Sequence, residues 1–233
     1  MKCIKNEIKI KELFNKLALN YDKNNNIISL YLHKLIKKDA IKKLKIKENT
    51  TILDLCTGTG DIIEYILKQQ NAIKKIIGID FSSKMLKIAR KRFKKEKNVK
   101  FINQNASKLP FCNSAFDYIT ISFGFRNIKH KIRTLKEIKR VLKPNGKIIH
   151  LDFGKSNWFI NMIFEFIVNF ILKLFYKKSA PYKYLLKSKE DFYSPNELIK
   201  LFELRGFILE KRVDYLFGIL SMQIYKKIKL KQL

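Results

Sequence analysis

The stretch TILDLCTGTGD (residues 51–61) begins with a short apolar, β-rich run, which predicts a strand, and continues into a turn that contains two glycines. Gly58 and Gly60 let the backbone turn tightly and come close to a ligand. The residues that follow, DIIEYILKQQ (61–70), have the spacing of a helix. In open parallel sheets, ligands bind beyond the carboxyl ends of the strands, so this turn is a candidate binding site.

Strand and helix patterns alternate from this turn to about residue 155. Further strands are predicted at 74–80, 98–104, 116–123 and 147–153, and helices at 82–96 and 131–142, with Ser82 or Ser83 as a helix cap. A helix near 195–205 and two strand-like runs, 207–215 and 218–227, end the chain. The alternation predicts an α/β fold, in which helices cover both faces of one doubly wound, mostly parallel sheet.

The whole chain, residues 1–233, is predicted to be a single domain, because no Pro/Gly-rich linker divides it. Apolar residues at helical spacing in 6–20 and 27–45 predict a helical cover over 1–47, ahead of a binding core at 48–155. Residues 156–194 are predicted as a helical insertion that contains a long apolar helix. Residues 195–233 complete the domain with a helix and strands.

Composition excludes some classes of protein and leaves the meaning of the charge open. The formal net charge is +30, from 50 Lys and Arg against 20 Asp and Glu. A nucleic-acid surface, an anionic membrane surface and compositional drift would each explain this excess, and the scattering of the lysines along the chain favours drift. The three cysteines, Cys3, Cys56 and Cys112, form no CxxC pair, so neither a disulfide framework nor a metal site is predicted. The charged N-terminus is unlike a signal peptide, which predicts a cytoplasmic protein.

Two carboxylates and a missing glycine refine the candidate site. Asp54 lies on the first strand, where it is expected to accept N–H groups of the turn. Asp80 ends the second strand and suits two ribose hydroxyls, with helix capping as the alternative. Ile63 stands where a dinucleotide-binding GxGxxG turn has its third glycine, which argues against pyrophosphate recognition.

Four segments resemble the successive motifs of class I S-adenosylmethionine-dependent methyltransferases, which have a Rossmann-like fold: LDLCTGTGD, GIDFSSKML, NASKLPF and RVLKPNGKIIHLDF. More narrowly, residues 109–156, with ISFGFRN at their centre, resemble the menaquinone/ubiquinone-biosynthesis C-methyltransferases. FNKLALNYDKNNNIISLYLHKLIK and YKYLLKS fit the same family. The resemblance implies S-adenosylmethionine as cofactor. Its implied contacts, together with Asp54 and the turn glycines Gly58 and Gly60, are Thr59, Asp80, Asn105, Ala106 and Ser122.

The resemblance also implies the substrate, a polyprenyl quinol whose ring carbon receives the methyl group, either demethylmenaquinol or a benzoquinol of ubiquinone biosynthesis. Such a carbon reacts once a ring hydroxyl has lost its proton. Arg126 is expected to stabilise the ionised oxygen, because an opposite charge favours the ionised form, and Asn127 to donate to a ring oxygen. The alternative is that Arg126 pairs with a carboxylate such as Asp152. Tyr21 and His33, from the N-terminal cover, and Asp152, at the end of the fifth strand, are candidate bases, and a bound water is an equal candidate.

Other functions remain open at this point. The chain could methylate another small molecule, such as a sterol or a phospholipid amine. It could also bind RNA, although no RNA-recognition module is apparent, or be a non-catalytic partner that keeps the fold. We expect no nucleic-acid partner, and a homodimer is open.

The apolar segment WFINMIFEFIVNFILKLFY (158–176) has polar residues at every fourth position. This spacing predicts a helix with one polar stripe, and its central glutamate disfavours a spanning helix. The segment could be an interfacial or substrate-facing helix, a core or dimer helix, or a spanning helix, and the polar stripe favours the first. We expect its broad apolar side, which includes Phe164 and Ile171, to bind membrane or isoprenoid, with peripheral contact at the inner face of the membrane.

Overall fold

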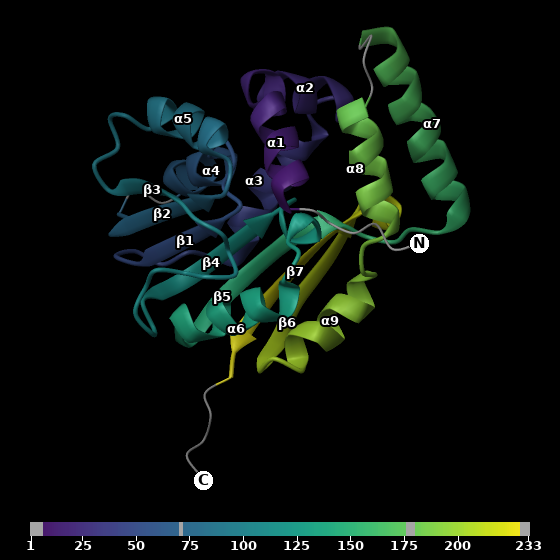
Figure 1. Cartoon of the computed structure of the whole chain (residues 1–233). Coiled ribbons are helices and arrows are strands. Elements are labelled where there is room, and N and C mark those ends of the chain that lie inside the picture. The colour runs from purple at the N-terminus through teal and green to yellow at the C-terminus, as the bar shows by residue number, and fades with distance from the viewer. Residues whose placement is uncertain (1–6, 70–71, 176–179, 229–233) are drawn as a thin grey trace.

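A computed structural model describes residues 7–69, 72–175 and 180–228, which form a single seven-stranded sheet with helices around it (Figure 1). The order of the strands is β3-β2-β1-β4-β5-β7-β6. The strands are β1 (Thr51–Leu55), β2 (Lys75–Asp80), β3 (Val99–Asn103), β4 (Phe116–Ser122), β5 (Leu142–Phe153), β6 (Phe207–Tyr215) and β7 (Leu220–Lys227). The first five are parallel, and β7 lies antiparallel to both β5 and β6. The predicted α/β fold with a mostly parallel sheet is confirmed.

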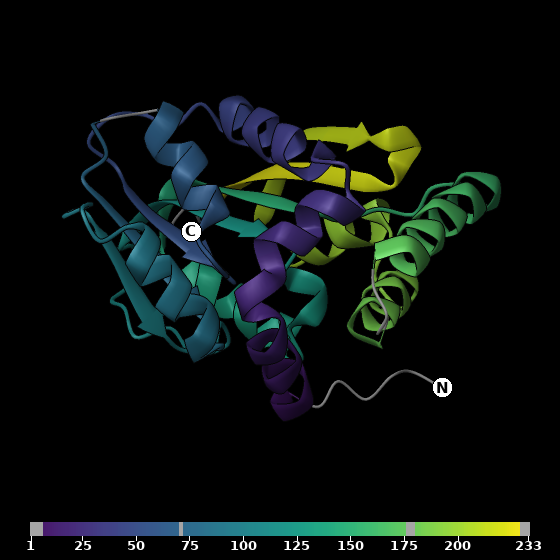
Figure 2. The same ribbon diagram turned by 90° about the horizontal axis from the view of Figure 1, so that it is seen from above.

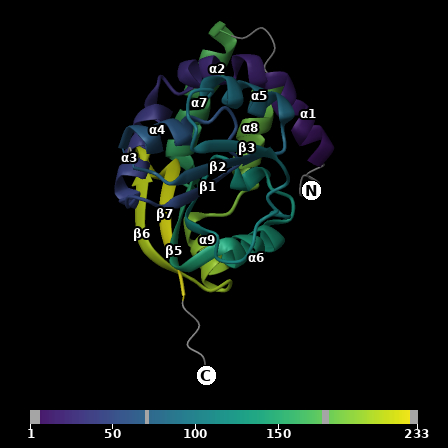
Figure 3. The ribbon, with the colours of Figure 1, turned by 90° about the vertical axis from the view of Figure 1, so that its left-hand side faces the viewer.

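Helices cover both faces of the sheet. On one face lie α3 (Leu32–Leu44) and α4 (Asp61–Gln69), and on the other α6 (Lys131–Val141) and α9 (Pro195–Glu203), as the end-on view shows (Figure 3). Each face has its own hydrophobic core. Ile52 packs into the core under α3 and α4, and its neighbour Leu53 packs into the core under α6 and α9. Successive strand residues point to opposite faces, so burial of both faces explains why the central strands are almost continuously apolar.

Most predicted elements begin and end within a few residues of their observed bounds. Ser82 is the cap of α5 (Ser83–Arg92), and its hydroxyl accepts the N–H of Met85 at 3.2 Å. Strand β5 begins at Leu142, five residues before the prediction, through an irregularity in its pairing with β4. A separate helix, α8 (Ala180–Glu190), was not predicted.

The remaining helices gather at the carboxyl ends of the parallel strands (Figures 1 and 2). They are α1 (Glu7–Leu17), α2 (Tyr21–Ile28) and α7 (Trp158–Phe175), with the short 3₁₀ turns η1 (Ala18–Asn20), η2 (Phe125–Asn127) and η3 (Leu216–Gly218). Helix α2 contacts α7, so the N-terminal cover and the apolar helix form one wall above the sheet. Within the described ranges, no helix is both long enough and apolar enough to cross a membrane.

Candidate active site

The glycine turn lies between β1 and α4, at the point where the strand order reverses. Gly58 and Gly60 both have positive φ, +56° and +90°. A Cβ on Gly60 would lie 2.5 Å from the ring of Phe93, whereas a Cβ on Gly58 would meet no atom within 4 Å. Gly60 is therefore required by packing, and Gly58 borders open space beyond the strand ends, where parallel sheets bind ligands.

Asp54 braces this turn, but through different partners from those expected. Its carboxylate accepts hydroxyl hydrogen bonds from Thr57 at 2.6 Å and from Thr120 of β4 at 2.5 Å. The prediction that it accepts N–H groups of the turn was wrong, because the N–H of Thr57 donates to Ile79 and that of Gly60 to the carbonyl of Thr57. Burial raises the pKa of Asp54 to about 6, against the effect of the two hydroxyl groups.

Asp80 lies at the end of β2 and faces the same turn. Its two carboxylate oxygens accept the N–H groups of Gly58 and Ser82, each at 2.9 Å. Burial raises its pKa to about 6, although these backbone hydrogen bonds oppose the shift. Each carboxylate oxygen can accept a further hydrogen bond, so the group still suits a pair of hydroxyls. The cap of α5 is the hydroxyl of Ser82.

Three further predicted cofactor contacts lie at the end of β4 and in the loop after β3. Ser122 ends β4, and its buried hydroxyl has no hydrogen-bond partner among the described residues. Asn105 accepts the N–H of Ser107 at 2.9 Å, and Ala106 beside it is buried. A buried hydroxyl without a partner is costly, so Ser122 has an unused hydrogen-bonding capacity, and its contact with the cofactor stays a prediction.

Helices α1 and α2 close over the site through polar contacts. The hydroxyl of Ser82 donates to Asn15 of α1 at 2.7 Å, and the amide of Asn105 donates to Glu7 at 3.3 Å. The hydroxyl of Thr59 donates to Asp22 of α2 at 2.6 Å. Thr59 is thus engaged with the cover, and its direct contact with the cofactor stays a prediction.

The residues present fit S-adenosylmethionine. Open space above Gly58, a carboxylate at Asp80 and an unpartnered hydroxyl at Ser122 offer room, a ribose acceptor and a polar contact at one edge of the sheet. A pyrophosphate site would have a third glycine or a basic residue in this turn, and the turn has neither.

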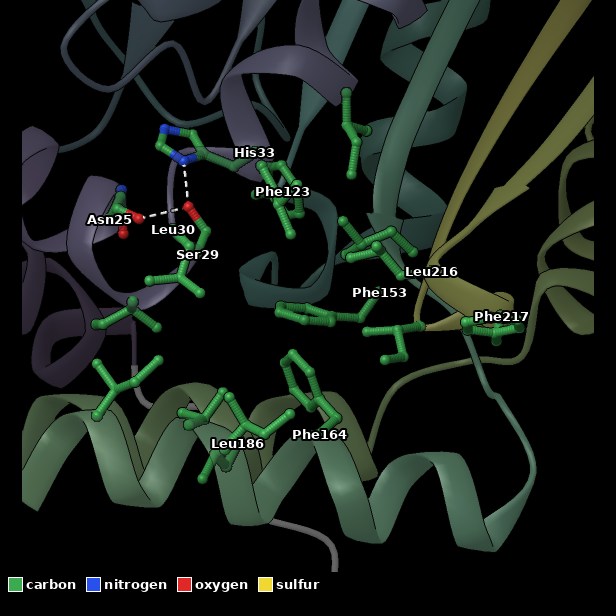
Figure 4. A pocket seen from close by; sticks show the side chains of 18 of the residues that line it. Asn25, Ser29, Leu30, His33, Phe123, Phe153, Phe164, Leu186, Leu216 and Phe217 are labelled. Carbon is green, nitrogen blue, oxygen red and sulfur yellow. Dashed lines mark hydrogen bonds between the residues drawn. The ribbon is translucent and has the colours of Figure 1, made fainter.

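A cavity of about 460 Å³ opens beside this site, between α2, α3, α7 and the ends of β4 and β5 (Figure 4). Most of its lining is apolar. Phe123 and Phe153 contribute from the sheet, Phe164 and Ile171 from α7, and Leu186 from α8. Its size and lining suit an apolar ligand with a few polar groups.

One wall of the cavity is polar, and its residues come from α2 and the start of α3. They are Tyr21, Asn25, Ser29, His33 and Lys37. The hydroxyl of Ser29 donates to the carbonyl of Asn25 at 2.6 Å and lies 2.5 Å from Nδ1 of His33 (Figure 4). Since the carbonyl can only accept, Ser29 accepts from Nδ1–H. Burial, with the nearby charge of Lys37, lowers the pKa of His33 to about 4, so this histidine is neutral near pH 7.

Arg126 also lines the cavity, and it is paired. Its guanidinium donates to Asp152 at 2.6 Å, to the carbonyl of Phe123 at 2.8 Å and to Ser188 of α8 at 3.3 Å. It also lies over the ring of Phe153, 5.0 Å from the centroid. The pairing with Asp152 is the alternative named in the sequence analysis, and the catalytic role of Arg126 stays a prediction.

Asn127 and Tyr21 take different positions around the cavity. Asn127 is not among the described residues that line the cavity, and its side-chain oxygen accepts the hydroxyl of Tyr184 at 3.0 Å, which ties η2 to α8. Tyr21 lines the cavity, where burial raises its pKa and the charge of Lys37 opposes the shift. The catalytic roles of both remain predictions.

The sequence analysis missed Lys37 and its partner Asp61. Lys37 is buried, and its ammonium donates to Asp61 at 3.2 Å. The signal was the spacing of His33 and Lys37, which are four residues apart and therefore lie on the same side of α3.

The comparisons with known proteins agree with this geometry. The model of the ubiE/COQ5 methyltransferase family matches residues 2–227. Demethylmenaquinone methyltransferase of Staphylococcus carnosus is 35% identical over 225 residues, which cover 94% of this chain and 93% of that protein. The enzyme of the same name from Staphylococcus aureus is 33% identical over 228 residues, which cover 95% of each.

A solved structure shares the fold. The crystal structure of a SAM-dependent methyltransferase from Aquifex aeolicus aligns with a TM-score of 0.61 and 24% identity, over 83% of this chain and 89% of that one. Fold, glycine turn and family match point the same way: the chain belongs to the ubiE/COQ5 methyltransferase family and is an S-adenosylmethionine-dependent methyltransferase.

Proposed function

We propose that this enzyme methylates a ring carbon of a polyprenyl quinol, and that its substrate is demethylmenaquinol. The observation that carries the proposal is the apolar cavity of about 460 Å³ with one polar wall beside the cofactor site. A quinol has the matching form, a ring with two hydroxyls and a long apolar tail. The names of the two staphylococcal relatives favour the naphthoquinol ring over the benzoquinol.

The two halves of the site have separate tasks. Asp80, Gly58 and Ser122 would hold the cofactor, with Asn105 and Ala106 beside its base. When bound, S-adenosylmethionine supplies an electrophilic methyl group on a positively charged sulfur. The chain contributes orientation and electrostatics, which are the main terms for such a transfer.

The quinol ring would lie against the polar wall, with Tyr21 and Arg126 near it, and the tail would run along α7. Phe164 and Ile171 line the cavity, so in this proposal they contact the tail. These two residues were expected to bind membrane or isoprenoid, and their place in the lining of the cavity favours the isoprenoid for both.

We propose that the outer side of α7 contacts the membrane instead. This side is apolar and exposed, and its members include Trp158, Phe159, Met162, Phe166, Phe170 and Leu174. The polar stripe turns toward α8, where Asn161 accepts a hydrogen bond from Lys189 at 2.6 Å. An exposed apolar helix face next to a tail cavity would let a membrane-resident quinol enter, and the net positive charge favours anionic lipid.

The direct test uses the purified chain with S-adenosylmethionine and short-tailed acceptors. We expect demethylmenaquinol to gain one methyl group, measured by mass spectrometry, and the corresponding benzoquinol to react more slowly. Methylation of phosphatidylethanolamine or a sterol, with no product from either quinol, would contradict the proposal.

A further inference from the structure

The cavity contains two cationic side chains among its described lining residues, and their charges are balanced to different degrees. Arg126 is 4% exposed and its partner Asp152 is 0% exposed, and hydrogen bonds to Asp152, Phe123 and Ser188 already engage its guanidinium. Lys37 is 8% exposed, and its ammonium makes one hydrogen bond to the described residues, to Asp61. An ammonium can donate three, so Lys37 retains donors for a ligand.

The carboxylate that Lys37 contacts is also shared. Asp61 accepts from Arg92 at 2.7 Å through its other oxygen. Arg92 and Lys37 together lower the pKa of Asp61 to about 2 against the effect of burial, so the carboxylate is ionised. Asp61 is thus shared between Lys37 and Arg92, although Arg92 also donates to Glu64 and lies 3.7 Å from Asp22. Asp61 is the one carboxylate that the ammonium of Lys37 hydrogen-bonds among the described residues.

Lys37 is held between two parts of the cofactor site. Asp61, 3.2 Å from its ammonium, is the first residue of α4 and follows the glycine turn directly. Phe123, whose ring centroid lies 5.6 Å from the ammonium, follows the last residue of β4. Lys37 and Phe123 both line the cavity, so an acceptor ring bound there has the ammonium within the wall of its site.

Other ionisable groups near Lys37 lie on several neighbouring elements. They are Tyr21 of α2, His33 of α3, Asp54 of β1, Arg126 of η2, and Arg92 of α5 through Asp61. His33 is neutral near pH 7, and Arg126 is paired with Asp152. Lys37 is thus the group on the polar wall whose positive charge is most available to an anion in the cavity.

We propose that Lys37 is a further catalytic residue, whose ammonium stabilises the ionised hydroxyl of the quinol. This inference rests on the proposed function. The step it assists is the ionisation of a ring hydroxyl. The O–H bond breaks and the proton leaves to water. The electron pair stays on the oxygen and is shared through the ring with the adjacent carbon that receives the methyl group. The ammonium keeps its own protons and donates one hydrogen bond to the anionic oxygen. A preorganised donor of this kind is worth about 10²–10³-fold in rate.

The test measures ionisation as well as turnover. We suggest 1-naphthol as the probe, with S-adenosylhomocysteine present, because the absorption of a naphthol reports whether its hydroxyl is ionised. The bound probe should ionise in Lys37→Met at a pH about 1–3 higher than in the wild type, the range for a nearby opposite charge. Turnover of short-tailed demethylmenaquinol should fall about 10²-fold in the same variant. Lys38→Met, on the exposed side of α3, should match the wild type in both measurements.

A second variant separates electrostatics from damage to the fold. Asp61→Asn breaks the same ion pair but removes the negative charge, so the probe should ionise at the same or a lower pH than in the wild type. A rise in both variants would indicate a disturbed site and overturn the proposal, as would equal ionisation in Lys37→Met and wild type. If the wild type methylates no quinol, the proposed function fails, and that result is read from the turnover assay alone.

Discussion

Removal of one partner of the ion pair between Arg126 and Asp152 should lower the free energy of unfolding. Replacing Arg126 by Met keeps an apolar stem to pack on Phe153 but removes the charge. Asp152 would then be a fully buried carboxylate with two backbone N–H partners, those of Arg126 at 3.3 Å and Phe153 at 2.9 Å. Breaking a buried pair from one side costs about 3–5 kcal/mol, and the two remaining N–H groups favour the lower end, about 3 kcal/mol.

A double-mutant cycle isolates the pair from the packing around it. Asp152→Asn alone should also destabilise the protein, because it leaves a buried guanidinium without its counter-ion. The double variant should lose less than the two single losses together, with a coupling of about 2 kcal/mol. Urea unfolding followed by circular dichroism gives the three free energies of unfolding.

The outcome that refutes this reasoning is a loss below about 1 kcal/mol in Arg126→Met together with additive single losses. The same variant also tests the predicted catalytic role, when turnover is expressed per folded molecule. A purely structural arginine leaves that turnover near the wild-type value, whereas direct contact with an ionised oxygen predicts a loss of about 10² in kcat.

Three further predictions concern the cofactor turn and α7. The pKa of Asp80 is raised in the folded protein, so the contribution of Asp80 to the free energy of unfolding falls as pH rises from about 4 to about 6. Cofactor affinity should rise over the same pH window, because the carboxylate becomes ionised. Titration calorimetry should show that Asp80→Asn lowers both the cofactor affinity and the pH dependence of that affinity. Gly58→Ala should cost only about 1 kcal/mol in stability but weaken cofactor binding at least tenfold, because the new methyl group enters the open space above the turn. The double change of Phe166 and Phe170 to Ser should reduce flotation with anionic liposomes by at least tenfold, since these rings are 72% and 56% exposed, whereas Phe164→Ser, in the cavity, should leave flotation unchanged.

The sheet and its glycine turn were predictable because local patterns determine them. Apolar runs followed by a turn locate β1, and parallel pairing then sets Asp54 beside Thr120. The pairing of β1 with β4 could be predicted from the sequence, but the hydrogen-bond donors to Asp54 could not. Backbone N–H groups were expected, because the sequence does not show which side of the strand the carboxylate occupies. The partners of such a side chain are set by register, which spans residues far apart in the chain.

The apolar helix shows a different limit. Periodicity found α7 and its polar stripe, but a helix that is apolar on most of its circumference does not reveal which apolar side faces the protein. Phe164 and Phe166 have the same character in the sequence, and only packing against α2 and the sheet separates the cavity side from the exposed side. Because α8 was not predicted, the direction of the polar stripe could not be predicted either. Asn161 of that stripe accepts a hydrogen bond from Lys189 of α8.

The two cations of the cavity illustrate how the environment, rather than residue type, decides the role of a charge. Arg126 was singled out from its motif, and Asp152 could be named as its alternative partner, because β4 and β5 are adjacent and end at the same edge of the sheet. Lys37 lies in a helix with several other lysines and has no motif to distinguish it. Its proposed role rests on three features that only the fold brings together: burial, a carboxylate shared with Arg92, and a position between the glycine turn and the end of β4. Of the two cations that line the cavity among the described residues, Lys37 hydrogen-bonds one carboxylate, whereas the guanidinium of Arg126 has at least three acceptors, and this difference is the ground for the proposed role of Lys37.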